Sequence, residues 1–425
     1  MMSEWIHYKM DDICDISSSK RIYRNEYVET GIPFYRGKEI ILKANNEKLK
    51  ETLFISEEKY QQIKERYDVP IPGDILLTSV GTLGIPYVVK DGEIFYFKDG
   101  NLTWFRNYKD IVNRKYFYFW LLSPKMKNQI NATRIGVAQP ALTIVGLKNF
   151  GIDLPPLPTQ KKIASILSAY DNLIENNTRR IQILEEMAQR IYKEWFVDFK
   201  YPGHENDELV DSDLGMIPEG WELKKTGEVF GIIGGGTPST KVPGYWENGT
   251  INWYSPKDLT KSDSMFALTS GSQISDLGLQ KSSAKLFPAF SVMLTSRATI
   301  GVVAINTTEA CTNQGFITCI PSENMSTYQI YYWLLNNIKM FLAYSSGATF
   351  KELTKTTFKK FDLVVPPKKT SSLFNELVIP IASEILTLQK QNGNLSQTRD
   401  LLLPKLISGK IDVSDLEIDT SILND

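Results

Sequence analysis

The longest pattern of apolar and polar positions occurs twice in this chain, each time after a pair of prolines. The first stretch, residues 155–187, reads PPLPTQKKIASILSAYDNLIENNTRRIQILEEM, and the second, residues 366–402, reads PPKKTSSLFNELVIPIASEILTLQKQNGNLSQTRDLL. In both, apolar residues recur at steps of three and four, and prolines at the start are typical of a helix N-terminus. We therefore predict two long helices, at 156–200 and 367–410, each roughly 60 Å in length.

Both helices carry a heptad seam, the pattern by which helices pair in a coiled coil. In the first helix the a positions are Leu167, Ile174, Ile181, Ala188 and Trp195, and the d positions are Ile163, Tyr170, Asn177, Leu184 and Ile191. In the second the a positions are Val378, Ile385, Asn392, Arg399 and Leu406, and the d positions are Phe374, Ile381, Leu388, Leu395 and Leu402. Each helix is the simplest partner for the other, in an antiparallel pair. Pro380 is expected to kink the second helix or delay its start, and Gly393 to weaken its middle.

One polar residue interrupts the middle of each seam. In an antiparallel pair, d positions of one helix lie near a positions of the other, so we predict that Asn177 meets Asn392. A buried asparagine pair fixes the register of a coiled coil at some cost in stability. The alternative is that both side chains face water at a defect in the seam.

Shorter patterns show that the chain is duplicated. LLTSVGTLGIPYVV (76–89) matches MLTSRATIGVVAI (293–305), and FYFWLLSP (117–124) matches IYYWLLNN (330–337). Further matched positions are Trp5 with Trp221, Trp120 with Trp333, Gly136 with Gly347 and Pro156 with Pro367. Each half is thus a globular unit of about 150 residues followed by a long helix.

Strand-like and helical runs are mixed within each globular unit, which indicates an α+β fold. We predict two similar α/β units with β-rich cores, residues 1–155 and 221–366, separated by the antiparallel helices in a pseudo-two-fold, cyclic arrangement. Residues 201–220, rich in Gly, Pro and acids, are interpreted as a linker, and 411–425 as a C-terminal tail. Such a frame acts as a ruler and suits a duplex DNA target with two half-sites.

Composition narrows the classes of function. The net charge is −1, so any contact with phosphates must come from local clusters of Lys and Arg. Three cysteines without a CxxC pair and two distant histidines argue against a zinc site or a disulfide scaffold. The N-terminus lacks the apolar core of a signal peptide, and no apolar run approaches the length of a membrane span. We therefore expect a cytoplasmic protein with no membrane partner and no metal site.

Basic, hydroxyl and amide side chains on loops are the candidates for DNA contact, because Arg and Gln can make paired hydrogen bonds to base edges. In the first unit these candidates are Lys20, Arg21, Arg24, Arg36, Lys38, Thr78, Ser79, Arg134 and Gln139. In the second unit they are Ser239, Thr240, Lys241, Lys257, Ser296, Arg297, Thr349, Lys351 and Lys355. The segments SSSKRIYRNEY (17–27) and GGGTPSTKVPGYW (234–246) differ between the halves, which predicts two unlike half-sites in a target that is not palindromic.

No catalytic residues are predicted. The chain lacks a GxxxxGK[ST] phosphate loop, and in DLPPLP (153–158) neither an acid nor an aromatic residue adjoins the two prolines, as an adenine methyltransferase motif requires. GIIGGGTPST (231–240) lacks the context of a dinucleotide fingerprint, and EEK (57–59) is too short to indicate a nuclease. Two alternatives stay open: a self-contained nuclease or methylase, and a scaffold that spaces two protein-binding domains without touching DNA.

Several segments together resemble the specificity subunit of type I restriction-modification systems. They are GGGTPST (234–240), PPLPTQKKIASIL and DNLIENNTRRIQILEEM (155–187), KEWFVDF (193–199), SDLGMIPEGWE (212–222) and LLPKLISGKIDV (402–413). One departure is Thr-Gln-Lys at 159–161, where the family often has Glu-Gln.

The resemblance implies a non-catalytic DNA-recognition subunit. Two target-recognition domains would each read one half of an asymmetric, bipartite sequence in double-stranded DNA. The helices would set the gap and dock two methyltransferase subunits, and restriction subunits would join in the full complex, for both adenine methylation and restriction. This chain would bind no cofactor; S-adenosylmethionine, ATP and Mg²⁺ would be bound by the partner subunits.

Overall fold

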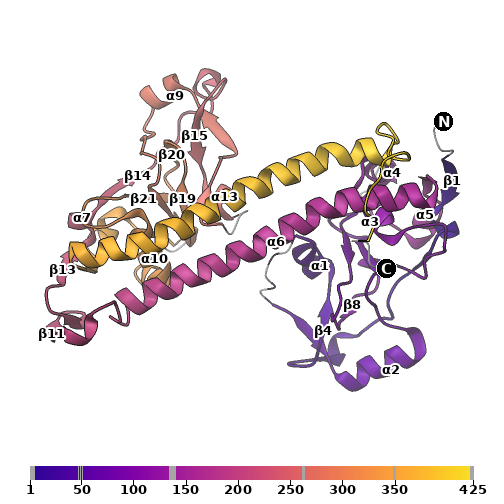
Figure 1. Ribbon diagram of the computed structural model, residues 1–425, viewed down its shortest axis with the longest axis horizontal. Coiled ribbons are helices and arrows are strands. Elements are labelled where there is room, and N and C mark those ends of the chain that lie inside the picture. The colour runs from indigo at the N-terminus through magenta and orange to yellow at the C-terminus, as the bar shows by residue number, and fades with distance from the viewer. Residues whose placement is uncertain are drawn as a thin grey trace. The chain divides into compact units, whose positions relative to one another are not determined.

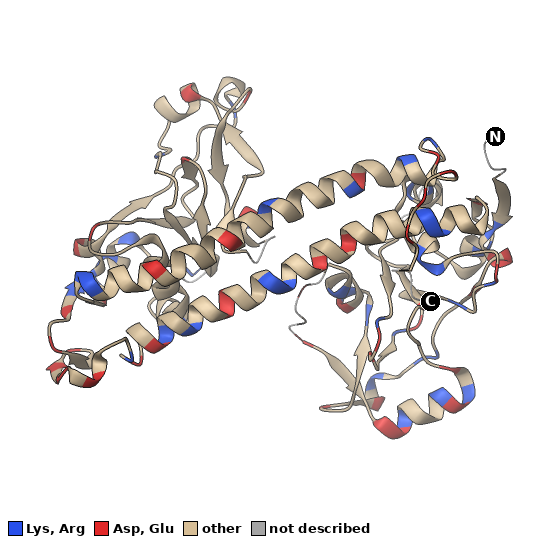
Figure 2. Cartoon of the chain, in the orientation of Figure 1, with Lys and Arg blue, Asp and Glu red and all other residues tan. Residues whose placement is uncertain are grey.

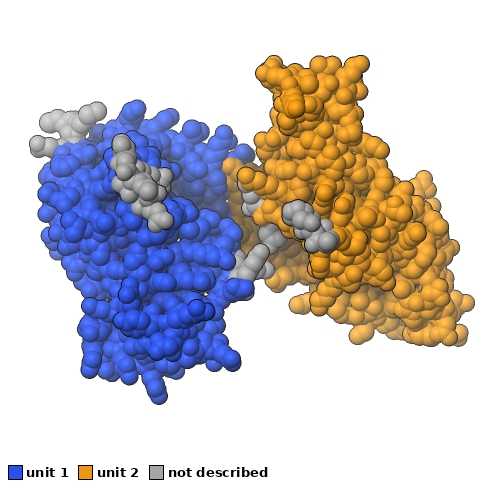
Figure 3. Space-filling model, turned by 180° about the vertical axis from the view of Figure 1, so that it is seen from behind, with its two compact units in different colours: residues 1–174, 394–425 blue, residues 175–393 orange. Residues whose placement is uncertain are grey.

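The computed structural model describes residues 5–45, 47, 49, 51–133, 140–260, 264–347 and 351–421. The chain divides into two compact units (Figure 3): unit 1 is residues 1–174 with 394–425, and unit 2 is residues 175–393. Both divisions fall inside the long helices α6 (Leu157–Phe196) and α13 (Lys368–Ile407), so each helix contributes to both units.

The described residues of unit 1 form three small sheets. Its strands are β1 (Ile6–Lys9), β2 (Asp15–Ser17), β3 (Tyr27–Val28), β4 (Ile32–Tyr35), β5 (Leu53–Ile55), β6 (Ile75–Thr78), β7 (Pro86–Val88), β8 (Tyr96–Phe97), β9 (Leu102–Arg106) and β10 (Gly151–Leu154). The sheet orders are β2-β9-β6-β7, β3-β5-β4-β8 and β1-β10. The helices are η1 (Met10–Asp12), η2 (Arg24–Glu26), α1 (Gly37–Ala44), α2 (Glu57–Tyr67), α3 (Arg114–Leu122), α4 (Pro124–Thr133) and α5 (Ile144–Lys148).

In unit 2 the part of the chain that the structure describes forms four sheets. Its strands are β11 (Leu209–Ser212), β12 (Gly215–Pro218), β13 (Glu222–Lys225), β14 (Gly231–Gly234), β15 (Ile251–Tyr254), β16 (Phe266–Ala267), β17 (Ser272–Ile274), β18 (Val292–Arg297), β19 (Thr299–Asn306), β20 (Ala310–Thr312), β21 (Phe316–Ile320) and β22 (Asp362–Val365). The orders are β14-β21-β18-β19-β16, β17-β15-β20, β13-β22 and β11-β12. The helices are η3 (His204–Asn206), α7 (Thr226–Val229), η4 (Pro243–Tyr245), α8 (Pro256–Thr260), α9 (Asp276–Gln280), α10 (Thr327–Asn336), α11 (Ile338–Ala343) and α12 (Lys355–Phe358).

The predicted duplication is confirmed strand by strand. The order β2-β9-β6-β7 in unit 1 is repeated by β14-β21-β18-β19 in unit 2, and the pair β1-β10 by β13-β22. In the smaller sheets, β4 pairs in parallel with β8 as β15 does with β20. α3 and α10 begin at equivalent caps, Asn113 and Ser326, whose side chains accept hydrogen bonds from backbone N–H groups of the first turn. Trp120 and Trp333 are buried in the cores beside them, as their matched positions predict.

The two long helices are each 40 residues in length and follow the predicted seam. Every a and d position is buried or half-buried, since each apolar stripe packs into the core of its unit. In unit 1 Arg399, an a residue, donates from Nη1 to Asp171 Oδ1 at 2.5 Å, and in unit 2 Arg180 Nη2 donates to Glu384 at 2.6 Å. Within unit 2 Asn177 contacts Asn392 and Arg180 contacts Glu384, so residue numbers rise along α6 as they fall along α13, and the helices run antiparallel (Figure 1).

The delayed start that Pro380 was expected to cause in the second helix is not observed. α13 is continuous from Lys368 to Ile407 and passes through Pro380, which is exposed. The side chains of Phe374, Val378 and Ile385 are fully buried on the opposite face of the helix, and this packing holds the proline in the helix. α13 is also long and apolar enough to cross a membrane by length and composition alone, but these buried side chains belong to the core of unit 2.

The segments expected to be a linker and a tail are packed. Residues 201–220 form the hairpin of β11 and β12, and Tyr201 and Ile217 are buried in the core of unit 2 with Trp221. In unit 1 Val413 is buried in the core, and Lys162 Nζ donates to the carbonyl of Ser414 at 2.5 Å. Residues 201–220 are rich in Gly, Pro and acids, but they also include a few large apolar residues, and these are enough to anchor the segment.

Candidate nucleic-acid interface

Several cationic side chains converge on one open pocket of unit 1, with a volume of about 710 Å³. Its cationic and aromatic lining residues are Arg21, Arg24, Arg36, Lys98, Tyr23 and Tyr27. Asp99 is the acidic residue among the described residues of this lining. Acidic and basic side chains are mixed over the rest of the chain (Figure 2), so this local excess of positive charge is what phosphates would meet.

Strand pairing explains why these side chains meet. β4 and β8 are parallel neighbours in register, with Tyr35 opposite Phe97. The next residue of each strand is therefore Arg36, which caps α1, and Lys98. The three arginines are among the residues predicted from the sequence, but Lys98 is not, because the pairing of β4 with β8 spans a long stretch of chain and leaves no local pattern.

The four cations have different freedom. Arg36 donates from Nη2 and Nε to the two carboxylate oxygens of the buried Glu39, at 2.6 and 3.1 Å. Burial alone would raise the pKa of Glu39, but the hydrogen bonds from Arg36 outweigh burial and lower that pKa below its usual value. Arg21 lies 3.1 Å from Asp99 with its side chain 67% exposed. Arg24 and Lys98 have no ion pair within the described part of the chain. Arg36 thus builds the pocket, and the other three can meet a ligand.

Two other predicted cations of unit 1 lie outside this lining. Lys20 places its ammonium 4.6 Å from the ring centre of Tyr67 in α2, and Lys38 is exposed in the first turn of α1.

The prediction is wrong for three hydroxyl residues, whose side chains are buried. Thr78, Ser79 and Ser296 are 0, 3 and 3% exposed. Thr78 Oγ1 accepts a hydrogen bond from Ile85 N at 2.9 Å, and Ser79 Oγ lies 2.6 Å from Thr103 Oγ1. The hydroxyls of Thr78 and Ser79 thus satisfy polar groups at the end of a central strand and shape the turn that follows.

The remaining described candidates of unit 2 are exposed. They are Ser239, Thr240, Lys241, Lys257, Arg297, Lys351 and Lys355. The first three follow β14 in one loop, and Lys257 lies in α8. Arg297 ends β18, and the carbonyl of Lys351 accepts a hydrogen bond from Ala298 N at 3.1 Å, so these two cations border the same turn. Arg134, Gln139 and Thr349 lie outside the described residues.

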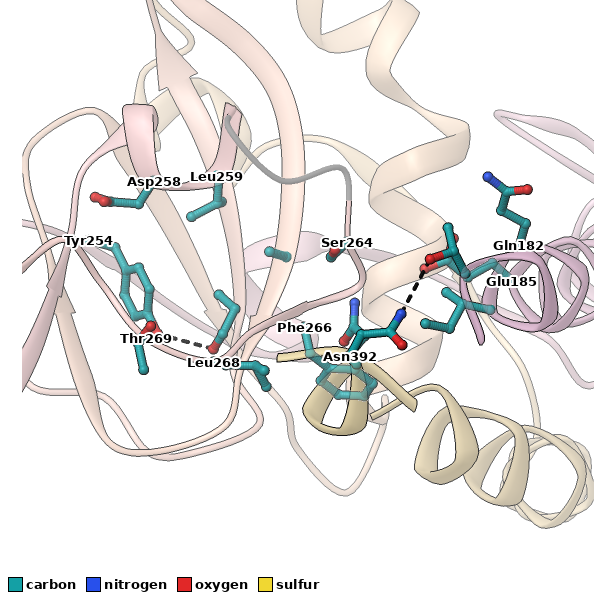
Figure 4. A pocket seen from close by; sticks show the side chains of 15 residues that line it. Gln182, Glu185, Tyr254, Asp258, Leu259, Ser264, Phe266, Leu268, Thr269 and Asn392 are labelled. Atoms are coloured by element: carbon teal, nitrogen blue, oxygen red, sulfur yellow. Dashed lines mark hydrogen bonds between the residues drawn. The ribbon is translucent and has the colours of Figure 1, made fainter. Parts of the chain in front are cut away.

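The two asparagines of the helical seam are in contact within unit 2. Asn177 Nδ2 donates to Asn392 Oδ1 at 3.0 Å, and Asn392 Nδ2 donates to Thr178 Oγ1 at 3.3 Å. The predicted meeting is thus observed. Asn392 also lines a cavity of about 390 Å³ between the helices and the sheet, together with Gln182 and Glu185 of α6 (Figure 4).

Comparison with known proteins agrees with the duplication of the chain. A family model described as "Type I restriction modification DNA specificity domain" matches residues 2–186 and again residues 218–391. The chain belongs to this family. The two matches cover the two halves of the duplication, so each half is one specificity domain.

Relatives of similar length support the assignment. The MjaIX specificity subunit of Methanocaldococcus jannaschii is 30% identical over 81% of this chain and 79% of its own length. The HindI specificity subunit of Haemophilus influenzae is 25% identical over 96% of this chain and all of its own. The crystal structure of a type I S subunit from M. genitalium shares the fold, with a TM-score of 0.59 and 14% identity over 95% of this chain and 96% of that one. These relatives are named as specificity subunits of restriction enzymes, in agreement with a role in recognition and not in catalysis.

Proposed function

We propose that this chain recognises a bipartite sequence in double-stranded DNA on behalf of a type I restriction-modification complex. Each specificity domain would read one half-site, and the differing loops of the two domains would make the half-sites unlike. The observation that carries the proposal is the duplication of one β-rich frame, which presents a cationic pocket in unit 1 and a loop cluster with Arg297 and Lys351 in unit 2. A non-DNA scaffold would have no use for cationic surfaces of this kind on both units.

The partner subunits follow from the resemblance and from the family. We propose that the paired helices set the gap between half-sites and bind two methyltransferase subunits, which restriction subunits join in the full complex. S-adenosylmethionine, ATP and Mg²⁺ would be bound by those subunits, and the complex would work in the cytoplasm. The exposed apolar residues Ile183 and Met187 of α6, both in unit 2, provide a surface for a helical partner.

Binding by the complex with the methyltransferase subunits tests the proposal. A library of duplexes, sequenced before and after binding, should yield one asymmetric, gapped sequence, and the affinity for that sequence should fall as salt rises. Arg24→Gln and Lys98→Gln in the pocket of unit 1 should lower affinity and reduce the slope of affinity against salt by about one counterion each. Equal binding of the wild-type complex to all duplexes would refute the proposal. Methylome sequencing of cells that carry the system reports the target independently.

A further inference from the structure

The turn between the two central strands of each unit has the same hydrogen-bond frame. In unit 1 Thr78 Oγ1 accepts from Ile85 N at 2.9 Å; in unit 2 Thr295 Oγ1 accepts from Val302 N at 2.9 Å. A neighbouring segment binds each turn from the side. Leu142 N donates to the carbonyl of Ser79, and Leu353 N to that of Ser296, at 2.9 and 2.8 Å. The two turns therefore have the same hydrogen-bonded structure.

Backbone angles in the turns agree residue by residue. Gly81 and Ala298 both have a left-handed φ, +77° and +61°, and so do Gly84 and Gly301. A left-handed conformation is costly for alanine and not for glycine. Ala298 thus keeps the strained geometry even without glycine, which indicates that the neighbouring contacts of the turn hold it there.

At one position of this turn the two units have side chains of different chemistry. The residue that precedes the left-handed one is Val80 in unit 1 and Arg297 in unit 2, and both are exposed. Each makes the same bridge to the neighbouring segment, Val80 with Ala141 and Arg297 with Glu352. The same backbone therefore presents an apolar side chain to solvent in one unit and a guanidinium in the other.

Both turns border the surfaces already assigned to DNA. In unit 1 Ser79 N donates to the carbonyl of Asn101 at 2.8 Å, and Asn101 lines the cationic pocket. In unit 2 the turn is bound to Lys351 through Ala298 N, and Lys351 is exposed. Arg297 Nε lies 3.9 Å from Glu352 Oε2, a loose contact that orients the side chain and leaves the two terminal nitrogens of the guanidinium available.

From these observations we infer that positions 80 and 297 are equivalent base-reading positions, and that they give the two units different base preferences. Arg297 would donate a pair of hydrogen bonds to O6 and N7 of a guanine in the major groove. Val80 would contact the 5-methyl group of a thymine, because an apolar side chain cannot satisfy the polar edge of guanine. Glu352 is a positioning residue for Arg297. This inference rests on the proposed function and adds the bases read at one position of each half-site.

The test is reciprocal substitution in the full chain, assembled with its methyltransferase partner and bound to a duplex library. Arg297→Val should reduce the preference for guanine at one position of one half-site by about 10- to 100-fold and leave the other half-site unchanged. Val80→Arg should create a preference for guanine at one position of the other half-site. Arg297→Lys keeps the charge without the paired donors, so it should retain affinity but lose most of the guanine preference.

Lys281→Gln, which removes an exposed charge at the end of α9, serves as the control and should leave both half-sites unchanged. The inference is overturned if Arg297→Val preserves every base preference, or if Arg297→Lys discriminates guanine as well as wild type, since Arg297 would then contact only phosphate. In either case the wild-type complex would still select a bipartite sequence, so the proposed function would stand. A wild-type complex without sequence preference would refute both the proposed function and this inference.

Discussion

At the scale of single residues, Ala298 shows how the duplicated frame constrains the sequence. Its φ of +61° is left-handed, whereas the equivalent Gly81 takes φ +77° without strain. We expect Ala298→Gly to raise the free energy of unfolding by about 1 kcal/mol, because relief of strain exceeds the added entropy of the unfolded glycine. Chemical denaturation of the full chain measures this change.

The matched substitution is Gly81→Ala, for which no atom lies within 4 Å of the added Cβ. Gly81→Ala should lower the free energy of unfolding by about 1 kcal/mol, because alanine is strained in the left-handed conformation. A neutral result for both substitutions would show that these turns relax and that the left-handed angle carries no strain.

The buried Glu39 provides a pH-dependent prediction. Burial opposes its charge, but hydrogen bonds from Arg36 lower its pKa below the usual value. A lowered pKa in the folded state means that the carboxylate stabilises the protein above the usual glutamate pKa, and that this contribution is lost as pH falls through the folded-state pKa. Glu39→Gln should thus cost about 1–3 kcal/mol at neutral pH.

Melting temperatures of wild type and Glu39→Gln, measured from neutral pH down into acid, should converge as the pH falls. A gap that stays constant with pH would show that the loss comes from packing and not from the charge. Glu29→Gln is the control, since Glu29 is exposed, and it should have little effect at any pH.

The sequence pattern indicated cations that lie together at the surface, but it did not separate exposed from buried hydroxyl groups. Arg21, Arg24 and Arg36 converge on one pocket, since long cationic side chains near a turn usually reach the surface. Thr78, Ser79 and Ser296 are buried, because a serine or threonine can satisfy a backbone N–H at the end of a strand as readily as a ligand. The sequence pattern of a strand followed by Thr-Ser does not separate these roles.

At the scale of elements, the heptad assignment predicted both helices and the contact of Asn177 with Asn392, now seen at 3.0 Å. One hydrogen bond joins the two amides in the half-buried seam of unit 2. Asn177→Leu alone should cost about 1–3 kcal/mol, because it leaves a polar amide facing an apolar side chain. The double variant with Asn392→Leu should recover part or all of this loss.

A double-mutant cycle from denaturation curves measures the coupling of the pair. Additive effects of the two single variants would contradict a direct interaction. Ile174→Val, a small change at another seam position, controls for the loss of apolar packing and should cost about 1 kcal/mol.

Pro380 marks the limit of element-level prediction. Pro380 favours a later start of the helix, yet α13 begins at Lys368 and runs through the proline. The fully buried Phe374, Val378 and Ile385 supply more packing than one backbone hydrogen bond is worth. The hairpin of β11 and β12 was missed for a related reason. Its anchors, Tyr201 and Ile217, are two apolar residues in an otherwise polar segment, and nothing local shows that they pack.

At the scale of the whole molecule, the duplication and the family were evident from sequence, whereas the long-range pairing that builds each surface was not. The parallel partnership of β4 with β8, which brings Arg36 beside Lys98, depends on the complete fold. We expect that adding residues in phase to both α6 and α13 will lengthen the gap in the DNA target and leave each half-site unchanged, since the reading loops lie outside the helices.

Methylome sequencing of cells with the lengthened chain reports the gap directly. An equal number of residues added to the turn between β11 and β12 is the control, and it should leave the gap unchanged. An unaltered gap after lengthening of both helices would refute their role as a spacer.

The division of the chain inside its long helices has a consequence for the order in which the protein can fold during synthesis. Unit 2 is one continuous segment, residues 175–393, whereas unit 1 also requires residues 394–425. The core of unit 1 includes Leu406, Ile407 and Val413 together with Ile163 and Leu167. On the ribosome the first unit to emerge is therefore the last to be completed, and its apolar helix face stays uncovered while the second unit closes.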